Sequence, residues 1–157
     1  MIDIIIPVKN DNDNILELIP KFLKNLKYDF IIFEKYGVKF HFTSLHNIVD
    51  VESLINENTK VIWAETPTNP MINIFDIEAL SKVSKSNNLL FVVDNTFASP
   101  YLQNPLNLGA DIVMHSATKY LAGHSDVVLG ALMLNDDKIA EKLYFVQNAS
   151  GAVPGPQ

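Results

Sequence analysis

The feature that most constrains the fold is a set of three short apolar runs, each of which ends in polar residues. The runs and the polar segments after them are Lys60–Ala64 before Glu65–Pro70, Leu89–Val93 before Asp94–Thr96, and Asp111–His115 before Ser116–Tyr120. Apolar runs of this length are typical of strands buried in a parallel sheet. Ligands of open α/β sheets bind outside the carboxyl ends of the strands, so all three polar segments are candidate site loops.

Strand-like and helical patterns alternate along the whole chain. The predicted strands are Ile2–Val8, Val38–Phe42, Val61–Ala64, Leu90–Val93, Ile112–Met114 and Val127–Leu134. The predicted helices are Ile15–Leu26, Val49–Asn56, Ile74–Ser86 and Asp136–Asn148. This alternation predicts an α/β fold with a mostly parallel sheet, flanked by helices and built by right-handed crossovers.

One lysine, Lys119, stands among small hydroxyl residues directly after a predicted strand, in the run SATKY. A lysine forms a Schiff base with an aldehyde only as the neutral amine, so its site must lower its pKa by desolvation or by nearby positive charge. The alternative is an ordinary solvent-exposed lysine. The position at a strand end makes Lys119 a candidate anchor for an aldehyde cofactor.

Two further polar side chains follow neighbouring predicted strands. A carboxylate at Asp94 can pair with a pyridinium nitrogen, as the chemistry of pyridoxal 5'-phosphate (PLP) requires. The amide of Asn69, which precedes Pro70, can donate to a ring oxygen. Each also has a plain structural interpretation, Asp94 as a turn or helix-capping residue and Asn69 as a turn signal before proline. Three such loops at the ends of strands in one sheet favour a shared site.

Several segments of the sequence resemble the Cys/Met-metabolism family of PLP-dependent enzymes. They are VIWAETPTNP, FVVDNTFASPYLQNPLNLGADIVMHSATKYLAGHSDVVLGALML and FVQNASGAVPGPQ. The family contains cystathionine γ-synthases, cystathionine γ- and β-lyases and methionine γ-lyases. The resemblance extends from about Phe33 to Gln157, and its ending looks most like bacterial cystathionine γ-synthases. It implies that residues 33–157 are part of the large domain of an aspartate-aminotransferase-like PLP-dependent transferase.

The resemblance implies a role for six residues and identifies the cofactor as PLP. Lys119 would bind the cofactor covalently and move protons at the substrate's α and β carbons, and Asp94 would pair with the pyridine nitrogen. The other expected cofactor-binding residues are Asn69 at the phenolic oxygen, Thr96 near the ring, and Ser116 and Thr118 at the phosphate. The implied activity is that of cystathionine γ-synthase, a cytoplasmic transferase of methionine biosynthesis in which cysteine replaces the leaving group of an O-acylhomoserine. A lyase activity of the same family is an implied alternative. The resemblance also implies a homo-oligomer, whose partners are copies of the same chain.

The sequence also departs from the family pattern. Family members are more than twice this length, so we expect the chain to be part of a larger enzyme. All 12 basic residues are lysines, so the arginine that binds the substrate carboxylate in the family has no counterpart here. Leu26 aligns with the family's ring-stacking tyrosine, and Tyr28 lies two positions away. We therefore expect the chain to be inactive alone.

Residues 1–32 differ from the rest of the chain. Their strand, polar loop and helical pattern weakly resemble the start of a family 2 glycosyltransferase, without a downstream Asp-x-Asp motif. A junction between two coding fragments and simple divergence both explain the segment. The chain is thus predicted to contain a divergent or foreign segment, 1–32, and a partial PLP domain, 33–157. A nucleotide-sugar-binding fragment and a non-catalytic dimerising remnant are the alternative functions.

Composition excludes several other classes of function. The net charge of −6 argues against nucleic-acid binding. The absence of cysteine excludes disulfides, thiol catalysis and cysteine-ligated metals, and no metal site is predicted. The sequence has neither an apolar run of membrane-spanning length nor a basic signal-peptide start. We therefore expect a cytoplasmic protein without membrane association.

Overall fold

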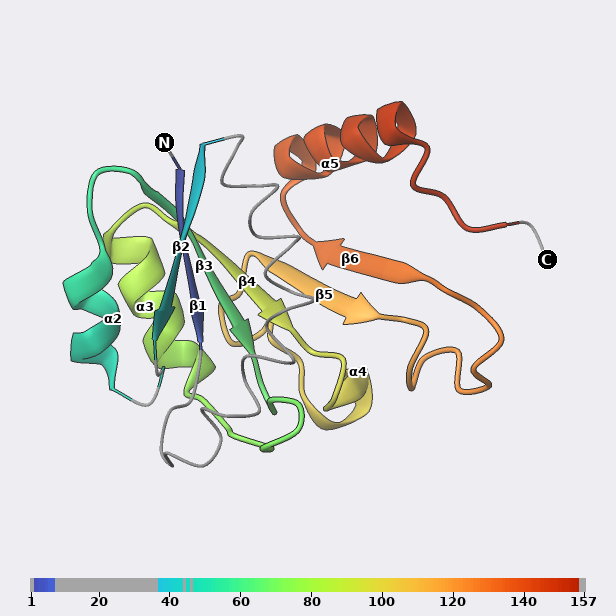
Figure 1. The fold of residues 1–157 in the computed structure, drawn as a ribbon, viewed down its shortest axis with the longest axis horizontal. Coiled ribbons are helices and arrows are strands. Elements are labelled where there is room, and N and C mark those ends of the chain that lie inside the picture. The colour runs from blue at the N-terminus through green and yellow to red at the C-terminus, as the bar shows by residue number, and fades with distance from the viewer. Residues whose placement is uncertain (1, 8–36, 44, 46, 156–157) are drawn as a thin grey trace. The chain divides into compact units, whose positions relative to one another are not determined.

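The computed structural model describes residues 2–7, 37–43, 45 and 47–155 (Figure 1). The chain divides into two compact units. The first comprises Met1–Ala64 and Ala79–Phe91, and the second comprises Glu65–Glu78 and Val92–Gln157. The predicted helix at residues 15–26 and the position of Tyr28 lie outside the described residues.

The first unit contains three parallel strands in the order β2-β1-β3. They are β1 (Ile2–Pro7), β2 (Val38–Thr43) and β3 (Thr59–Glu65), whose last residue belongs to the second unit. β1 pairs in parallel with both neighbours. The helices are α2 (Ile48–Leu54) and α3 (Ile77–Ser86). Val51 of α2, Ile62 of β3 and Leu80 of α3 are fully buried and form the centre of this unit's core.

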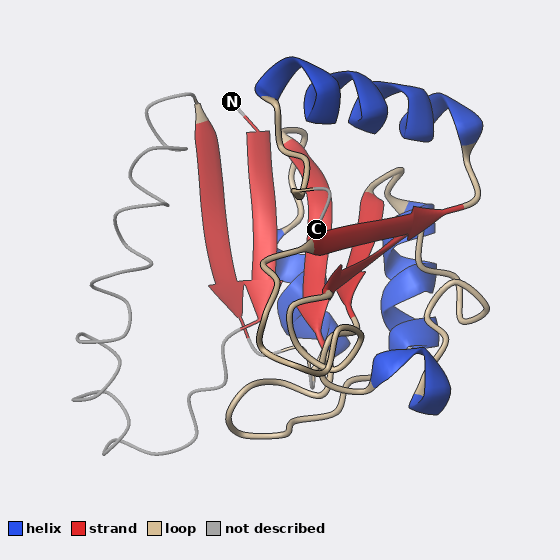
Figure 2. Cartoon of the chain, turned by 90° about the vertical axis from the view of Figure 1, so that its right-hand side faces the viewer, coloured by secondary structure: helices blue, strands red, loops and turns tan. Residues whose placement is uncertain are grey.

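The second unit holds the ends of strands that carry the site. β4 (Leu90–Asp94), of which all but the first two residues belong to this unit, is parallel to β5 (Ile112–Ser116). β5 is antiparallel to β6 (Gly130–Leu134), and the opposite directions of these two arrows are visible in Figure 2. The helices are the short α4 (Ser99–Leu102) and the longer α5 (Asp137–Ser150). The predicted α/β class with a mostly parallel sheet is confirmed.

Two predicted elements need correction. The helix predicted from Ile74 begins at Ile77, because the backbone N–H of Phe75 donates to Thr66 Oγ1 (3.0 Å) instead of joining the helix. The strand predicted from Val127 begins at Gly130 and is antiparallel to β5. Here the chain turns back without a crossover helix, since the backbone N–H of Thr118 donates to the carbonyl of Leu129 (3.1 Å) and closes a loop.

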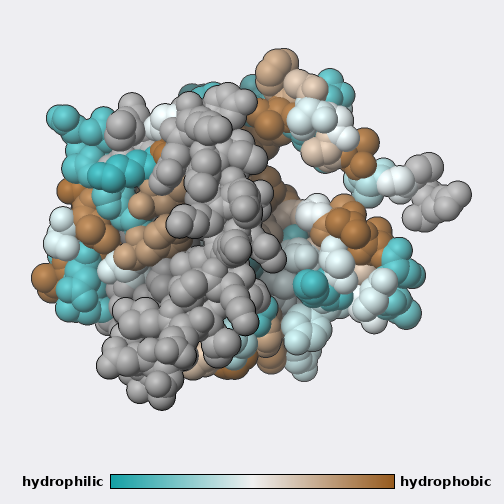
Figure 3. Space-filling view, in the orientation of Figure 1, coloured by the Kyte–Doolittle hydropathy of each residue, from teal (hydrophilic) through white to brown (hydrophobic). Residues whose placement is uncertain are grey.

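The predicted C-terminal helix is α5, and its ends have clear causes. The Asp136 side chain caps its start by accepting from the N–H of Ile139 (2.9 Å). Gly151 ends it with a φ of +68°, in the left-handed region that glycine tolerates best. None of its residues is buried. Tyr144, Phe145 and Val146 are exposed, and Figure 3 shows hydrophobic surface along this helix.

The described part of the chain contains neither a candidate membrane span nor a candidate metal site. No helix in it is both long enough and apolar enough to cross a membrane. It also contains no group of three or more histidine or carboxylate side chains placed to hold a metal ion.

Candidate active site

The loop after β3 is closed by hydrogen bonds that place Asn69 near the end of β4. The backbone N–H of Thr66 donates to the carbonyl of Asp94 (3.3 Å). Thr68 and Asn73 are joined twice at 3.0 Å, by the N–H of Thr68 on the Asn73 carbonyl and by the N–H of Asn73 on Thr68 Oγ1. The peptide bonds before Pro67 and Pro70 are both cis. Asn69 therefore lies inside a closed turn at the carboxyl end of the strand.

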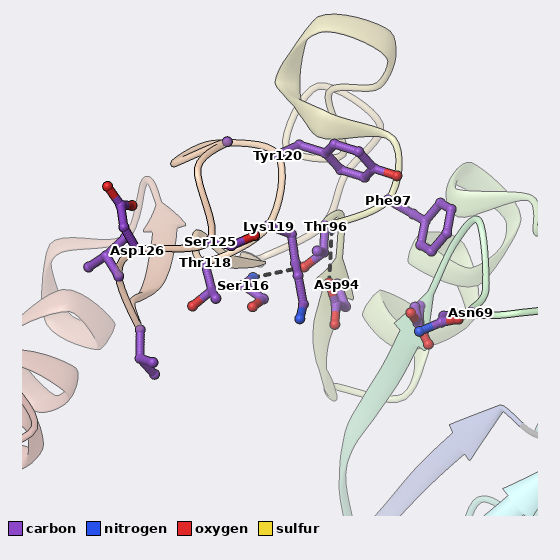
Figure 4. A pocket seen from close by; sticks show the side chains of 14 residues that line it. Asn69, Asp94, Thr96, Phe97, Ser116, Thr118, Lys119, Tyr120, Ser125 and Asp126 are labelled. Atoms are coloured by element: carbon purple, nitrogen blue, oxygen red, sulfur yellow. Dashed lines mark hydrogen bonds between the residues drawn. The ribbon is translucent and has the colours of Figure 1, made fainter.

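The loop after β4 begins with a turn in which one of the two carboxylate oxygens of Asp94 accepts a hydrogen bond. Asp94 Oδ1 accepts from the backbone N–H of Thr96 (2.9 Å), so the turn interpretation of Asp94 describes one of its oxygens. No hydrogen bond to Oδ2 occurs within the residues that the structure describes. The Thr96 hydroxyl in turn accepts from the N–H of Ser116 (2.8 Å), which links this loop to the end of β5 (Figure 4).

The turn after β5 carries Lys119. Its backbone N–H donates to the carbonyl of Ser116 (3.0 Å), and its own carbonyl accepts from Gly123 (2.8 Å). Figure 4 shows the Lys119 side chain entering the same cavity as Asp94. No ion pair or hydrogen bond of the Lys119 amine is present in the described portion of the chain. Lys119 is also exposed, so its amine is accessible to a ligand.

All six residues that the sequence predicts line one cavity of about 770 Å³, a volume typical of small-molecule sites. The cavity belongs entirely to the second unit. Its lining adds residues that the sequence did not single out as site residues, namely Glu65, Phe97, Tyr120, Gly123, Ser125, Asp126, Val127 and Val128. His124, interpreted as structural, is absent from the lining, and its Nδ1 lies 2.7 Å from the carbonyl of Ala122.

Two aromatic side chains form part of the cavity wall. The rings of Phe97 and Tyr120 pack edge to face, with centroids 6.0 Å apart and an interplanar angle of 74°. Such pairs contribute about 0.5–1.5 kcal/mol beyond the area that they bury. The contact joins the loop after β4 to the turn that carries the lysine, and therefore supports the arrangement of the two loops.

Glu65 is the titratable residue whose protonation the site changes most clearly. Burial, followed by the negative charge of Asp94, raises the pKa of Glu65 from 4.5 to about 7, and a hydrogen bond from the backbone N–H of Asn69 acts in the opposite direction. Burial also lowers the pKa of His115, against the effect of the Asp94 charge. Near neutral pH, Glu65 is therefore partly protonated, and the cavity carries less negative charge than its carboxylates suggest.

The two hydroxyl residues expected at a phosphate differ in their bonds. The Thr118 hydroxyl accepts from the N–H of Leu129 (2.9 Å) and donates to its carbonyl (3.3 Å). The Ser116 hydroxyl has no hydrogen bond within the described ranges of the chain. Ser116 is therefore ready to donate to an anion, whereas Thr118 must first release the carbonyl of Leu129.

Comparison with known proteins identifies the family. Residues 24–157 match the family model described as Cys/Met metabolism PLP-dependent enzyme. The chain belongs to this family of PLP-dependent enzymes. The predicted resemblance is thereby confirmed. The cavity that contains Lys119 and Asp94 is the candidate cofactor site.

The relatives include enzymes with different reactions. The chain is 50% identical over 125 residues to a probable cystathionine γ-synthase from Herpetosiphon aurantiacus, which covers 80% of this chain and 39% of the relative. It is 48% identical over 126 residues to a cystathionine β-lyase from Lactococcus lactis, with 80% and 33% covered. A crystal structure of cystathionine γ-lyase from Lactobacillus plantarum, complexed with L-serine, superposes with a TM-score of 0.79 at 41% identity. That match covers 99% of this chain and 38% of the other.

The chain spans between a third and two fifths of the length of these relatives. These relatives are a γ-synthase, a β-lyase and a γ-lyase, at similar sequence identity to this chain. The comparisons thus establish a PLP-dependent trans-sulfuration family and leave the particular reaction open.

Proposed function

We propose that the chain forms the cofactor site of a PLP-dependent trans-sulfuration enzyme, with Lys119 as the residue that binds PLP covalently. The observation that carries the proposal is the meeting of three strand ends at one cavity. Asn69 follows β3, Asp94 ends β4, and Lys119 follows β5, and all three line the same space. A single small aromatic ligand there would contact an amine, a carboxylate and an amide.

The side chains present fit PLP in their chemistry. Asp94 keeps one carboxylate oxygen outside its turn and can hold a proton on a ring nitrogen. The Asn69 amide is a donor for a phenolic oxygen, and the hydroxyl of Ser116 is a donor for phosphate. Thr118 adds a second hydroxyl, at the expense of its longer bond to Leu129, and Thr96 holds the loop that contains Asp94. The set contains one donor or acceptor for each polar group of the cofactor.

Bound PLP supplies an aldehyde that condenses with amines and a ring that accepts electrons from the substrate's α carbon. Lys119 Nζ would hold PLP covalently in the loaded site, and its amine, once released by a substrate amine, would be the base that takes the α proton. Because the side chain remains in the cavity, the same amine would also remove a proton from the β carbon and later return it. Asp94 would keep the ring nitrogen of bound PLP protonated, which maintains the electron-accepting state of the ring.

For the particular reaction we propose γ-replacement, in which cysteine displaces the ester group of an O-acylhomoserine. The match to a probable cystathionine γ-synthase and the ending SGAVPGPQ support this choice over β-elimination. We propose residues 33–157 as the cofactor-binding part and 1–32 as a divergent or foreign segment. No turnover by the 157-residue chain alone is expected, since none of its side chains is a guanidinium.

A thermal-shift experiment tests the cofactor proposal. PLP should raise the melting temperature of the chain, because a ligand that binds only the folded state stabilises it. A nucleotide sugar should leave the melting temperature unchanged. The reverse pattern would favour the glycosyltransferase alternative. If neither ligand acts and light scattering shows a defined dimer, the chain is a non-catalytic remnant and the proposal is wrong.

A further inference from the structure

Asn95 is a buried amide at the junction of two cavity loops. It is 1% exposed, and its backbone N–H donates to the carbonyl of Met114 (2.9 Å). Its side-chain Nδ2 donates to the carbonyls of Ser99 (3.2 Å) and Gln103 (2.9 Å), at the two ends of α4. These two carbonyls use both N–H groups and fix the orientation of the amide, so Oδ1 is left as an acceptor.

Gln103 completes the connection to the loop after β3. Its Nε2 donates to Asn95 Oδ1 and to the carbonyl of Thr66, both at 2.8 Å. Thr66 is completely buried. A buried polar group that loses its partner destabilises the fold. Gln103 therefore joins the loop after β3, at Thr66, to the loop after β4, at Asn95.

The Asn95 amide also holds a residue with an unusual backbone angle and contacts the end of β5. Ser99 has a φ of +64°, in a region that a serine rarely adopts, and its carbonyl is held by Asn95. His115, at the end of β5, is also 1% exposed. Its Nε2 lies 3.4 Å from Asn95 Nδ2. The same amide therefore contacts the α4 segment, the β3 loop through Gln103, and β5.

We propose that Gln103 and Asn95 are positioning residues, which hold the loops after β3 and β4 so that Asn69 and Asp94 face the cavity of Lys119. Neither Gln103 nor Asn95 lines the cavity, so neither contacts a ligand there. The claim that these residues help to position PLP rests on the proposed function. The claim that they hold the two loops does not depend on it. The two parts are therefore tested by separate measurements.

The test replaces Gln103 by methionine in the full chain, since methionine has a similar length and no N–H donors. The control is Ser84→Ala, which removes a buried hydrogen bond to the carbonyl of Leu89 (3.2 Å) in the first unit. We expect Gln103→Met to accelerate hydrogen–deuterium exchange at the amides of Thr66 and Thr96. It should also raise the PLP concentration for half-maximal binding by about ten-fold. Ser84→Ala should change neither quantity when compared at equal distance below its melting temperature.

Each result decides one part of the proposal. Unchanged exchange at Thr66 and Thr96 in Gln103→Met would overturn it, whether or not the chain binds PLP. An equal loss of PLP binding in Ser84→Ala would show that only general stability is involved, which also overturns it. If the unmodified chain binds no PLP, the proposed function fails, and the exchange rates alone still decide whether the amides hold the loops. Gln103→Glu, which also lacks the N–H donors, replaces the methionine variant if that variant does not fold.

Discussion

The hydroxyl of Thr96 accepts a hydrogen bond of 2.8 Å from the backbone N–H of Ser116. The bond connects the loop that begins with Asp94 to the segment that leads into Lys119, and both of its residues line the cavity. It also leaves the Thr96 O–H proton available to a ligand. Thr96 therefore acts on the site through its hydrogen bond to the backbone of Ser116.

Replacing Thr96 by valine removes the acceptor and keeps the shape of the side chain. We expect the free energy of unfolding to fall by about 1–2 kcal/mol, because the N–H of Ser116 loses its partner. PLP binding should weaken by about ten-fold. Thr96→Ser keeps the hydroxyl and is the matched control. Urea unfolding and PLP titration of both variants check the prediction, and equal behaviour of valine and serine would contradict it.

Ser116 and Thr118 should differ in what their removal changes. Ser116→Ala removes a hydroxyl that has no hydrogen bond to any residue that the structure describes, so we expect weaker PLP binding with little loss of stability. Thr118→Val removes two bonds to Leu129, so we expect a loss of about 1–2 kcal/mol of stability and a smaller effect on PLP. Titration with PLP and with inorganic phosphate measures the binding, and urea unfolding measures the stability. The account is wrong if the two variants show the opposite ranking.

The raised pKa of Glu65 predicts a pH dependence of stability. The folded chain holds this proton up to about pH 7, whereas the unfolded chain releases it near the ordinary value of 4.5. Ionisation therefore favours the unfolded state as the pH rises between these two values. We expect the unfolding free energy of the parent chain to fall relative to that of Glu65→Gln over this range, and the difference to stay constant above it.

Urea unfolding of both chains at a series of pH values makes this measurement. The glutamine variant is an uncharged side chain of the same length, so it corrects for every other group that titrates, including His115. Curves that remain parallel from pH 4.5 to 7 would show that burial does not raise the pKa of Glu65.

Local signals in the sequence predicted the strands and Asn69, Asp94 and Lys119, whereas Thr96, Ser116 and Thr118 were predicted from the family resemblance. The apolar runs before Asp94 and Ser116 have the length of buried strands, and the polar residues after them mark strand ends. The family resemblance added their roles. The placement of these residues around one cavity follows from the parallel arrangement of β4 and β5, which the alternation of elements predicts.

Other parts of the site depend on contacts between distant segments. Nothing near Glu65 in the sequence indicates its raised pKa, which comes from burial and from Asp94 on another strand. The role of Gln103 depends on the carbonyl of Thr66, to which only the folded loop gives access. The antiparallel direction of β6 depends in the same way on the bonds between Thr118 and Leu129.

The most direct test of the cofactor site is to locate the lysine that PLP modifies. The chain is incubated with PLP, borohydride makes the link permanent, and mass spectrometry of the digest compares all 12 lysines. The control is Lys60→Ala, which removes an exposed lysine that donates to the carbonyl of Glu57 and lies outside the cavity. We predict modification at Lys119, retained in Lys60→Ala and lost in Lys119→Ala. Modification spread evenly over the lysines, or undiminished in Lys119→Ala, would contradict the account.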